Sequence, residues 1–318
     1  MVLIQNALAT AVLLVLCPIS WAQTLIPEAP APEDWDASAF DGEEPPIPEI
    51  IELTPEDMSM YAQRLADEGI NSTFAPAHPA FAFMGEGDDE ANIWGRAIYG
   101  TDDRVLHTDT STYPFSAIGR VQRQEGSTCT GSLIGPRHVL TARHCYRDGQ
   151  WIKFAPGYFD GEVGGSVYAT QIFRSSTLNP GPGWTDCDFR DDFIILVLGT
   201  NRMGERLGYF GARYVESNMV NAAPFRHVGY PGDRDGAQRP YRQDRINMHR
   251  HTRCDSSGPL DTTADMMGGQ SGGPMWLYWS DGSHYILGVA SASSSAESTF
   301  ASGSNMINYI IRAREDFP

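Results

Sequence analysis

Short apolar or alternating runs make up most of the chain after Arg96, and they constrain the fold more than any other sequence feature. Each run is four to eight residues long, and Gly, Pro, Asp and Asn residues separate the runs. Many short strands with turn signals between them are typical of an all-β sandwich or barrel. The predicted strands are Ser116–Gln122, Thr128–Ile134, Val139–Ala142, Trp151–Phe154, Ser166–Phe173, Phe193–Leu198, Phe225–Gly229, Pro274–Tyr278 and Tyr285–Ala290.

Helix is scarce in this region, and the best candidate is the last segment, Asn305–Glu315. Met306, Ile307, Ile310 and Ile311 recur there at helical spacing and make one apolar face. The sequence therefore predicts a β domain that ends in a helix.

Charge divides the chain into two parts. Residues 23–95 hold 17 acidic residues and one basic residue, whereas residues 96–318 hold 23 acidic and 22 basic residues. The formal net charge of the whole chain is −17, which argues against a polyanion such as nucleic acid as the main partner.

The first 22 residues are typical of a secretory signal peptide. The apolar run Ala7–Leu16 is followed by the small residues Ser20 and Ala22, which predicts cleavage before Gln23. The run is too short to span a bilayer, and no later stretch comes close to the necessary length. We expect a secreted, extracellular protein that does not enter the membrane; a buried N-terminal helix is the alternative.

Residues 23–96 are interpreted as an acidic propeptide, with a plain disordered tail as the alternative. Up to about Ile51 the segment is rich in Pro and acidic residues and is expected to be disordered. Thr54–Asp57 resembles a helix N-cap with a proline in the first turn, which predicts a short helix over Met58–Asp67. Asn71 lies in the one N-x-S/T sequon and would carry a glycan.

Three short motifs carry possible chemistry, and each is ambiguous by itself. Thr141–Cys145 (TARHC) ends an apolar strand with His144, and Asp191–Leu198 (DDFIILVL) places acidic residues before another strand. Gly268–Pro274 (GGQSGGP) sets Ser271 among glycines, which permit a backbone geometry in which successive N–H groups point to one spot. Their joint order is more informative than any one motif.

In the order His, Asp, Ser, these motifs resemble those of the chymotrypsin-like serine peptidases. The segments Ala97–Arg104 (AIYGTDDR), Cys129–Ile134 (CTGSLI) and Val228–Asp233 (VGYPGD) resemble those of the bacterial and fungal glutamyl endopeptidase group. The resemblance implies two antiparallel six-stranded β-barrels, packed face to face with the site between them, and a C-terminal helix. The first barrel would span residues 97–204 and the second residues 205–318.

The resemblance also implies a role for each residue of the motifs. Ser271 would attack the carbonyl carbon, and His144 would take its proton and return it to the leaving amine. Asp192 would orient the imidazole, and the backbone N–H groups of Gly269 and Ser271 would form the oxyanion hole. Asp191 is a rival for the acid and His138 is a weaker rival for the base.

Substrate preference is left open by the sequence. Asp265, six residues before Ser271, occupies the position that selects Arg or Lys in trypsin, but it could equally be turned away and hydrogen-bonded to backbone. Residues 288–293 lack the histidine of glutamate-specific members, and the neutral Gln270 replaces the aspartate that pairs with the new N-terminus of animal trypsins. The specificity pocket would comprise Asp265, Met266, Ala290, Ser291, Ala292 and Gly303.

Four cysteines remain after removal of the signal peptide, an even number that suits an oxidising compartment. The resemblance pairs Cys129 with Cys145, which leaves Cys187 and Cys254 for a second disulfide. The alternative interpretation of Cys254, as a metal ligand with His249 and His251, would fail if Cys254 is disulfide-bonded.

Together these features predict a secreted, monomeric serine endopeptidase that hydrolyses protein or peptide substrates through an acyl-enzyme, without a metal or organic cofactor. The propeptide would be a partner of its own catalytic domain and would be removed by cleavage between Arg96 and Ala97, which would unblock the cleft. The alternative function is that of a catalytically silent protein that uses the same fold to bind a partner.

Overall fold

The computed structural model describes residues 44–70, 76–77, 101–177, 183–199, 203–216, 219–221, 225–279, 282–294 and 297–318. The predicted signal peptide, the Asn71 sequon and the Arg96–Ala97 bond lie outside these residues. Within the described ranges, no helix is long and apolar enough to cross a membrane.

The first sheet closes into a six-stranded barrel. Its strands pair antiparallel in the order β7-β6-β3-β4-β5-β8, and β8 pairs back to β7. A further strand, β1, pairs in parallel with β7 on the outside of this ring. The strands are β1 (Glu49–Leu53), β3 (Ile118–Arg123), β4 (Thr128–Leu133), β5 (His138–Thr141), β6 (Ile152–Pro156), β7 (Val167–Ser175) and β8 (Ile194–Leu198).

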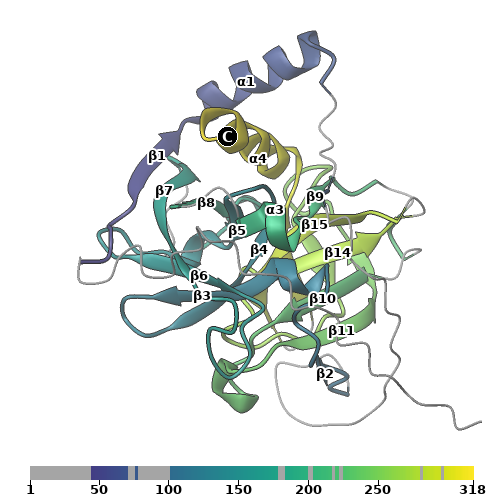
Figure 1. Cartoon of the computed structure of the whole chain (residues 1–318). Coiled ribbons are helices and arrows are strands. Elements are labelled where there is room, and N and C mark those ends of the chain that lie inside the picture. The colour runs from purple at the N-terminus through teal and green to yellow at the C-terminus, as the bar shows by residue number, and fades with distance from the viewer. Residues whose placement is uncertain are drawn as a thin grey trace, which may run out of the picture. The chain divides into compact units, whose positions relative to one another are not determined.

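The second sheet, whose strands β10, β11 and β14 are labelled in Figure 1, contains nine strands and has its own cluster of buried apolar residues. Its main path is β12-β13-β16-β15-β14-β10-β11-β2, with β9 beside β15. Only Asn247 separates β11 from β12 in the chain. This short link connects β12, at one end of the path, to β11, which lies beside β2 at the other end. The strands are β2 (Val105–Leu106), β9 (Gly211–Ala212), β10 (Phe225–Gly229), β11 (Tyr241–Ile246), β12 (Met248–Arg250), β13 (Leu260–Thr262), β14 (Pro274–Tyr278), β15 (His284–Ser293) and β16 (Ser298–Ser302).

This all-β architecture confirms the predicted fold class, with two differences. The second sheet was expected to be a six-stranded barrel, but among the described residues it is an open sheet of nine strands, because no pairing joins β12 to β2. The other difference is how the chain is shared between the sheets. Residues 97–204 were expected to belong to the first barrel, but β2 pairs with β11 of the second sheet. The chain therefore contributes a strand to the second sheet before it enters β3 of the first. A two-residue strand has too few side chains to show this pairing in the sequence.

In the described part of the chain, four α-helices accompany the sheets: α1 (Pro55–Asp67), α2 (Asp186–Arg190), α3 (Met203–Leu207) and α4 (Ser304–Asp316). Helix α4 confirms the predicted C-terminal helix and buries Met306, Ile307 and Ile310. Helix α1 confirms the predicted N-cap: the Thr54 side chain accepts a hydrogen bond from the Asp57 N–H, and the Asp57 carboxylate accepts one from the Thr54 N–H.

Strand β1 departs from the sequence prediction, which expected disorder up to about Ile51. Its five residues carry only weak β signals, and Leu53, at 8% exposed, is the buried one among them. The strand forms because β7 offers a free backbone edge to it, with Glu49 opposite Gln171 and Leu53 opposite Ser175. A tertiary contact thus decides the structure of a segment whose own composition does not.

Candidate active site

A buried carboxylate holds the imidazole of His144. Strands β5 and β8 pair with Thr141 opposite Ile194, so a residue just after β5 meets a residue just before β8. The His144 Nδ1–H donates to Asp192 Oδ2 at 2.7 Å, and the His144 backbone N–H donates to Asp192 Oδ1 at 3.0 Å. Ser291 Oγ donates a third hydrogen bond to Oδ2 at 2.6 Å. Asp192 is fully buried, so these bonds fix the ring and leave its Nε2 edge for other contacts.

The two rival residues lie elsewhere. Asp191 forms an ion pair with Arg190 at 2.5 Å and lines a cavity of about 460 Å³ beside α1 and α4. His138 donates from Nε2 to the Ala313 carbonyl of α4 at 3.1 Å, and burial lowers the pKa of its imidazole to about 4. No hydrogen bond or ion pair of the described residues joins either of them to the His144 ring.

The loop that carries Ser271 is fixed to both sheets. The Thr130 N–H of β4 donates to the Ser271 carbonyl at 2.8 Å, and the Gly272 N–H donates to the Ala290 carbonyl of β15 at 2.7 Å. Gly272 has φ +80°, and a Cβ there would lie 2.4 Å from the Thr130 carbonyl oxygen, so only glycine fits. The Cys145 sulfur, next to His144 in the chain, lies 3.7 Å from the Ser271 carbonyl oxygen. The loop therefore brings Ser271 to the junction that holds His144.

The His144 ring and the Ser271 hydroxyl, the two candidate reacting groups, are not hydrogen-bonded to each other in the described structure. Such bonds are often long in unliganded enzymes and tighten when substrate is bound.

Two backbone N–H groups of this loop remain open. The Gly232 N–H donates to the Gly268 carbonyl at 2.7 Å, and the Thr130 hydroxyl donates to the Gly269 carbonyl at 2.9 Å. In a trans peptide the N–H points opposite to the C=O, so the Gly269 N–H points away from Gly232. Within the described ranges, neither this N–H nor that of Ser271 donates to another backbone group. Two such donors can hold an oxyanion.

A buried arginine holds the residue before Ser271, a contact that no local sequence pattern indicates. Arg104 Nη1 donates to Gln270 Oε1 at 2.7 Å, and the same oxygen accepts from the Met267 N–H at 3.0 Å. The remaining Arg104 donors bind Asp102 at 2.9 Å and Asp233 at 2.7 Å. Burial by itself lowers the pKa of Arg104, but the hydrogen bonds and charges of the two carboxylates outweigh it and raise the pKa. Arg104 stays charged and ties Gln270 to the segment that precedes β2.

The Asp265 carboxylate is buried and accepts hydrogen bonds from neighbouring groups. Its Oδ2 accepts hydrogen bonds from the Asp103 backbone N–H at 3.2 Å and from Gln243 Nε2 at 3.4 Å. Its own N–H donates to Gln243 Oε1 at 2.7 Å. This is the second of the two arrangements considered from the sequence, in which the carboxylate is held by backbone. Of the other expected pocket residues, Met266, Ala290 and Gly303 are buried, and Ser291 and Ala292 are partly exposed.

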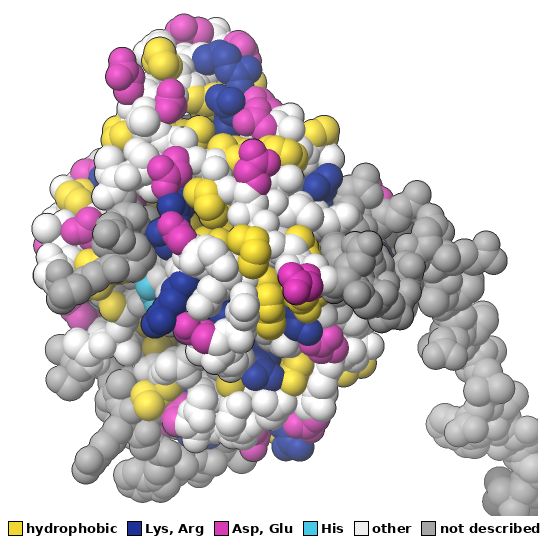
Figure 2. All heavy atoms as spheres, turned by 90° about the vertical axis from the view of Figure 1, so that its left-hand side faces the viewer, with side chains coloured by type: hydrophobic (Ala, Val, Ile, Leu, Met, Phe, Trp, Pro, Cys, Tyr) yellow, Lys and Arg dark blue, Asp and Glu magenta, His cyan; other side chains and the backbone are white. Residues whose placement is uncertain are grey.

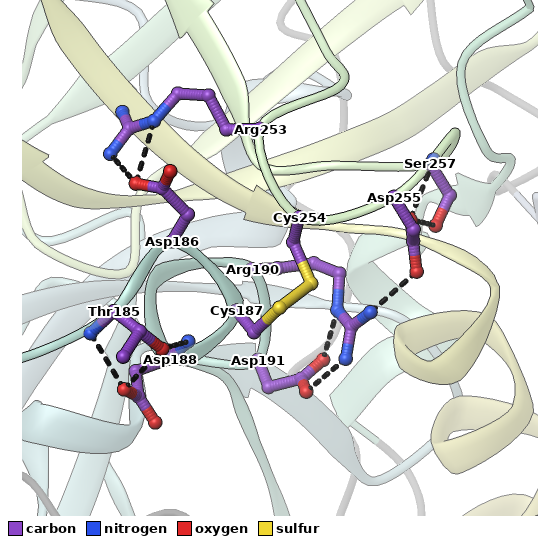
Figure 3. Close-up of a disulfide and its surroundings, with 10 residues drawn as sticks. All are labelled: Thr185, Asp186, Cys187, Asp188, Arg190, Asp191, Arg253, Cys254, Asp255 and Ser257. Carbon is purple, nitrogen blue, oxygen red and sulfur yellow. Dashed lines mark hydrogen bonds and ion pairs between the residues drawn. A yellow bond between two sulfur atoms is a disulfide. The ribbon is translucent and has the colours of Figure 1, made fainter.

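The structure contains both expected disulfides, Cys129–Cys145 and Cys187–Cys254. Figure 3 shows the second bond, which joins α2 to the loop before β13. The ion pair between Arg190 and Asp255 reinforces the same junction. Helix α2 leads directly into Asp192, so the bond anchors the approach to the candidate acid.

The disulfide also rules out a metal site that uses Cys254 together with His249 and His251. The sulfur of Cys254 is bonded to Cys187, and His249 Nε2 instead lies 3.2 Å from Glu297 Oε2.

Comparison with known proteins agrees with the fold. Glutamyl endopeptidase of Bacillus licheniformis is 32% identical over 196 residues, which are 57% of this chain and 55% of that protein. An extracellular metalloprotease of Bacillus subtilis is 27% identical over 196 residues, which are 58% of this chain and 59% of that protein. The chain thus spans somewhat more than half the length of these two relatives.

A solved structure of a Glu endopeptidase in complex with MPD is similar to this chain, with a TM-score of 0.57 and 24% identity, over 69% of this chain and 99% of that one. This likeness shows a shared fold. The family model described as Trypsin matches residues 105–311, which is more than half of the 318 residues, and the chain therefore belongs to the trypsin family.

Proposed function

We propose that this chain is a secreted serine endopeptidase that hydrolyses peptide bonds through an acyl-enzyme. The observation that carries the proposal is the junction between the sheets, where the His144–Asp192 pair lies beside the fixed Ser271 loop with its two open N–H groups. A trypsin-family match and relatives named as proteases support the same activity.

In the proposed reaction, Ser271 Oγ attacks the carbonyl carbon of the scissile bond and His144 Nε2 takes the hydroxyl proton. The new negative charge on the carbonyl oxygen is held by the N–H groups of Gly269 and Ser271. The C–N bond then breaks, and His144 returns the proton to the leaving amine. Water repeats the sequence on the ester and releases the acid, while Asp192 stabilises the imidazolium in both halves.

The test uses a fluorophosphonate probe, which reacts with an activated serine, together with a peptide hydrolysis assay. We expect Ser271→Ala to abolish labelling and to lower the hydrolysis rate by roughly a million-fold. Near-UV circular dichroism of the variant serves as the fold control. Labelling that persists in Ser271→Ala would identify another nucleophile, and a wild-type chain that neither labels nor hydrolyses would support the silent binding protein.

We further propose that residues 1–22 direct secretion and that activation cleaves the bond between Arg96 and Ala97. Contacts just downstream support this position: Arg104 is bound to Gln270, and the Asp103 N–H is bound to Asp265. A chain that starts at Ala97 would therefore begin a few residues before a segment already held against the Ser271 loop. N-terminal sequencing of the active secreted protein tests the site, and any start other than Ala97 rejects it.

The proposed substrates are proteins or peptides, and the proposed active form is a monomer. Asp265 is occupied by its own hydrogen bonds, and residues 288–293 contain no histidine, so neither feature favours cleavage after a particular residue type. Cleavage of a peptide library by the processed protein would determine the preference.

A further inference from the structure

The residues Glu49–Asp67, which we call the N-terminal clamp, are built into the fold although they lie in the predicted propeptide. Strand β1 pairs with residues 171–175 of β7, at the end of β7 that extends beyond its pairing with β6. The Ser176 N–H continues the pairing by donating to the Leu53 carbonyl at 3.1 Å. The clamp thus completes a sheet edge that would otherwise expose its backbone groups.

Side chains fix this strand from two sides. Arg174 of β7 donates from Nε to Glu52 Oε1 at 2.9 Å and from Nη2 to Asp148 Oδ2 at 2.9 Å, so one buried guanidinium joins the clamp to the loop after His144. On the other side, the Tyr309 hydroxyl of α4 donates to the Leu53 carbonyl at 3.2 Å.

Helix α1 adds an apolar contact. Met58, Tyr61 and Leu65 recur at helical spacing and are only 5%, 4% and 2% exposed. Figure 1 shows α1 lying against α4, and an ion pair of 2.5 Å between Arg64 and Glu315 joins the two helices. The Arg312 guanidinium of α4 also lies 5.3 Å from the centre of the Tyr61 ring.

The outward surface of the clamp differs from this buried one. Figure 2 shows acidic and basic side chains mixed over the top of the molecule, where the clamp lies. Met60, a large apolar residue of α1, is 61% exposed. The helix is therefore amphipathic, with one face used for packing and one facing solvent.

The contacts of the clamp do not involve the candidate catalytic groups. Apart from local bonds to residues 68–70, its described hydrogen bonds and ion pairs outside the clamp go to β7, to Ser176 and to α4. None of them reaches His144, Asp192 or Ser271. A segment that blocks a site by occupying it would have such contacts. The described part of the predicted propeptide is thus placed to support the first barrel.

We propose that the N-terminal clamp remains part of the folded protein after cleavage. When the chain is cut between residues 78 and 100, the clamp stays bound to the two-sheet body as a separate, non-covalent chain. Its docking site is the surface formed by the β7 edge and α4, and its occupant is this chain's own segment. Strand addition supplies specific backbone pairing, and the buried face of α1 supplies apolar contact. The proposal concerns association and holds whether or not the protein is a peptidase.

The test places a site for a sequence-specific protease between residues 78 and 100 of the secreted Ser271→Ala chain, which cannot digest itself under the proposed function. After cleavage, size-exclusion chromatography at micromolar concentration and intact mass measurement follow both fragments. We expect them to co-elute in a one-to-one ratio and to separate only in denaturant. A clamp that elutes alone from the otherwise unaltered chain overturns the proposal.

Matched variants identify the surface responsible. Met58→Asp with Leu65→Asp places two charges on the buried face, and we expect it to weaken association at least about a hundredfold. Met60→Asp makes the same kind of change on the exposed face and should leave association unchanged. Equal behaviour of the two variants would contradict the proposed contact.

Hydrogen exchange provides a readout that does not depend on the folding of any variant. In the cut Ser271→Ala chain, the amides of residues 171–175 should remain as protected as in the uncut chain. Loss of their protection on cutting would show that β1 leaves the sheet and would also overturn the proposal.

Discussion

Arg104 supports the loop of the proposed nucleophile, Ser271, through a buried hydrogen bond to Gln270. Its side chain is fully buried, and it joins Gln270 to two carboxylates that keep it charged. Gln270 in turn holds the Met267 N–H, so the turn that leads to Gly269 and Ser271 is fixed from behind. We infer that Arg104 is a positioning residue for the open N–H groups.

Replacing Arg104 should therefore affect turnover more than substrate binding. We expect Arg104→Met to lower kcat about tenfold to a hundredfold, with a smaller change in KM. This loss is smaller than the loss of kcat expected when an oxyanion donor is removed outright. Steady-state hydrolysis of a peptide substrate measures both constants. Gln270→Glu should keep activity because its carboxylate can still bind Arg104 and the Met267 N–H, whereas Gln270→Leu should lose it.

A neighbouring arginine provides the control for stability. Arg234 also pairs with Asp102 but makes no hydrogen bond to Gln270. Arg234→Met should disturb the carboxylate cluster while leaving kcat within about twofold of the wild-type value. If both variants lose kcat equally, the role of Arg104 is structural.

At the scale of elements, the register between β5 and β8 decides which of two adjacent acids serves His144. Asp191 ends α2 as its C-cap, with φ −96° and ψ 9°, whereas Asp192 lies two residues before β8, so the two carboxylates leave the chain in different settings. The observed register directs Asp192 to the imidazole, while Asp191 turns toward Arg190.

We therefore expect the two Asp→Asn substitutions to differ greatly. Asp192→Asn should lower kcat by roughly ten-thousandfold, because an amide cannot stabilise the imidazolium or favour the required tautomer. Asp191→Asn should change kcat less than about threefold, since that carboxylate pairs with an arginine outside the candidate site. Rates measured at pH 8 test this difference, and comparable losses would remove the assignment of Asp192.

At the scale of the whole molecule, each sheet contains a histidine that is kept neutral by burial. Burial lowers the pKa of His138 in the first barrel and of His227 in the second sheet to about 4. At pH 7 both are neutral in the folded and the unfolded chain. Below their unfolded pKa of about 6.5 the unfolded chain takes up protons that the folded chain cannot, so stability falls as the pH drops.

The predicted loss takes place between about pH 6.5 and pH 4 and amounts to about 3 kcal/mol for each histidine. Urea unfolding of the Ser271→Ala chain at several pH values measures it. His138→Gln and His227→Asn each keep a side-chain N–H donor but cannot be protonated, so the double variant should be much less sensitive to pH in this window. A double variant with the wild-type slope would assign the effect to other groups.

The sequence by itself determined the elements whose signals are local. Short apolar runs predicted most of the strands, the spacing of Met306, Ile307 and Ile310 predicted α4, and the Thr54 N-cap with its following proline predicted the start of α1. These patterns depend on residues that lie within a few positions of one another, so burial on one face of an element is visible in the order of its residues.

Only the tertiary structure decided the contacts between distant segments. The pairing of β1 with β7, the crossing of β2 to the second sheet, and the bond from Arg104 to Gln270 join segments more than a hundred residues apart. The same holds for Asp265, whose carboxylate faces a segment 162 residues earlier. Backbone edges and buried charges take whichever partner the folded chain brings to them, because an unpaired polar group in the interior costs free energy. No local pattern encodes that partner, and so the positions of these groups appear only when the two sheets are folded together.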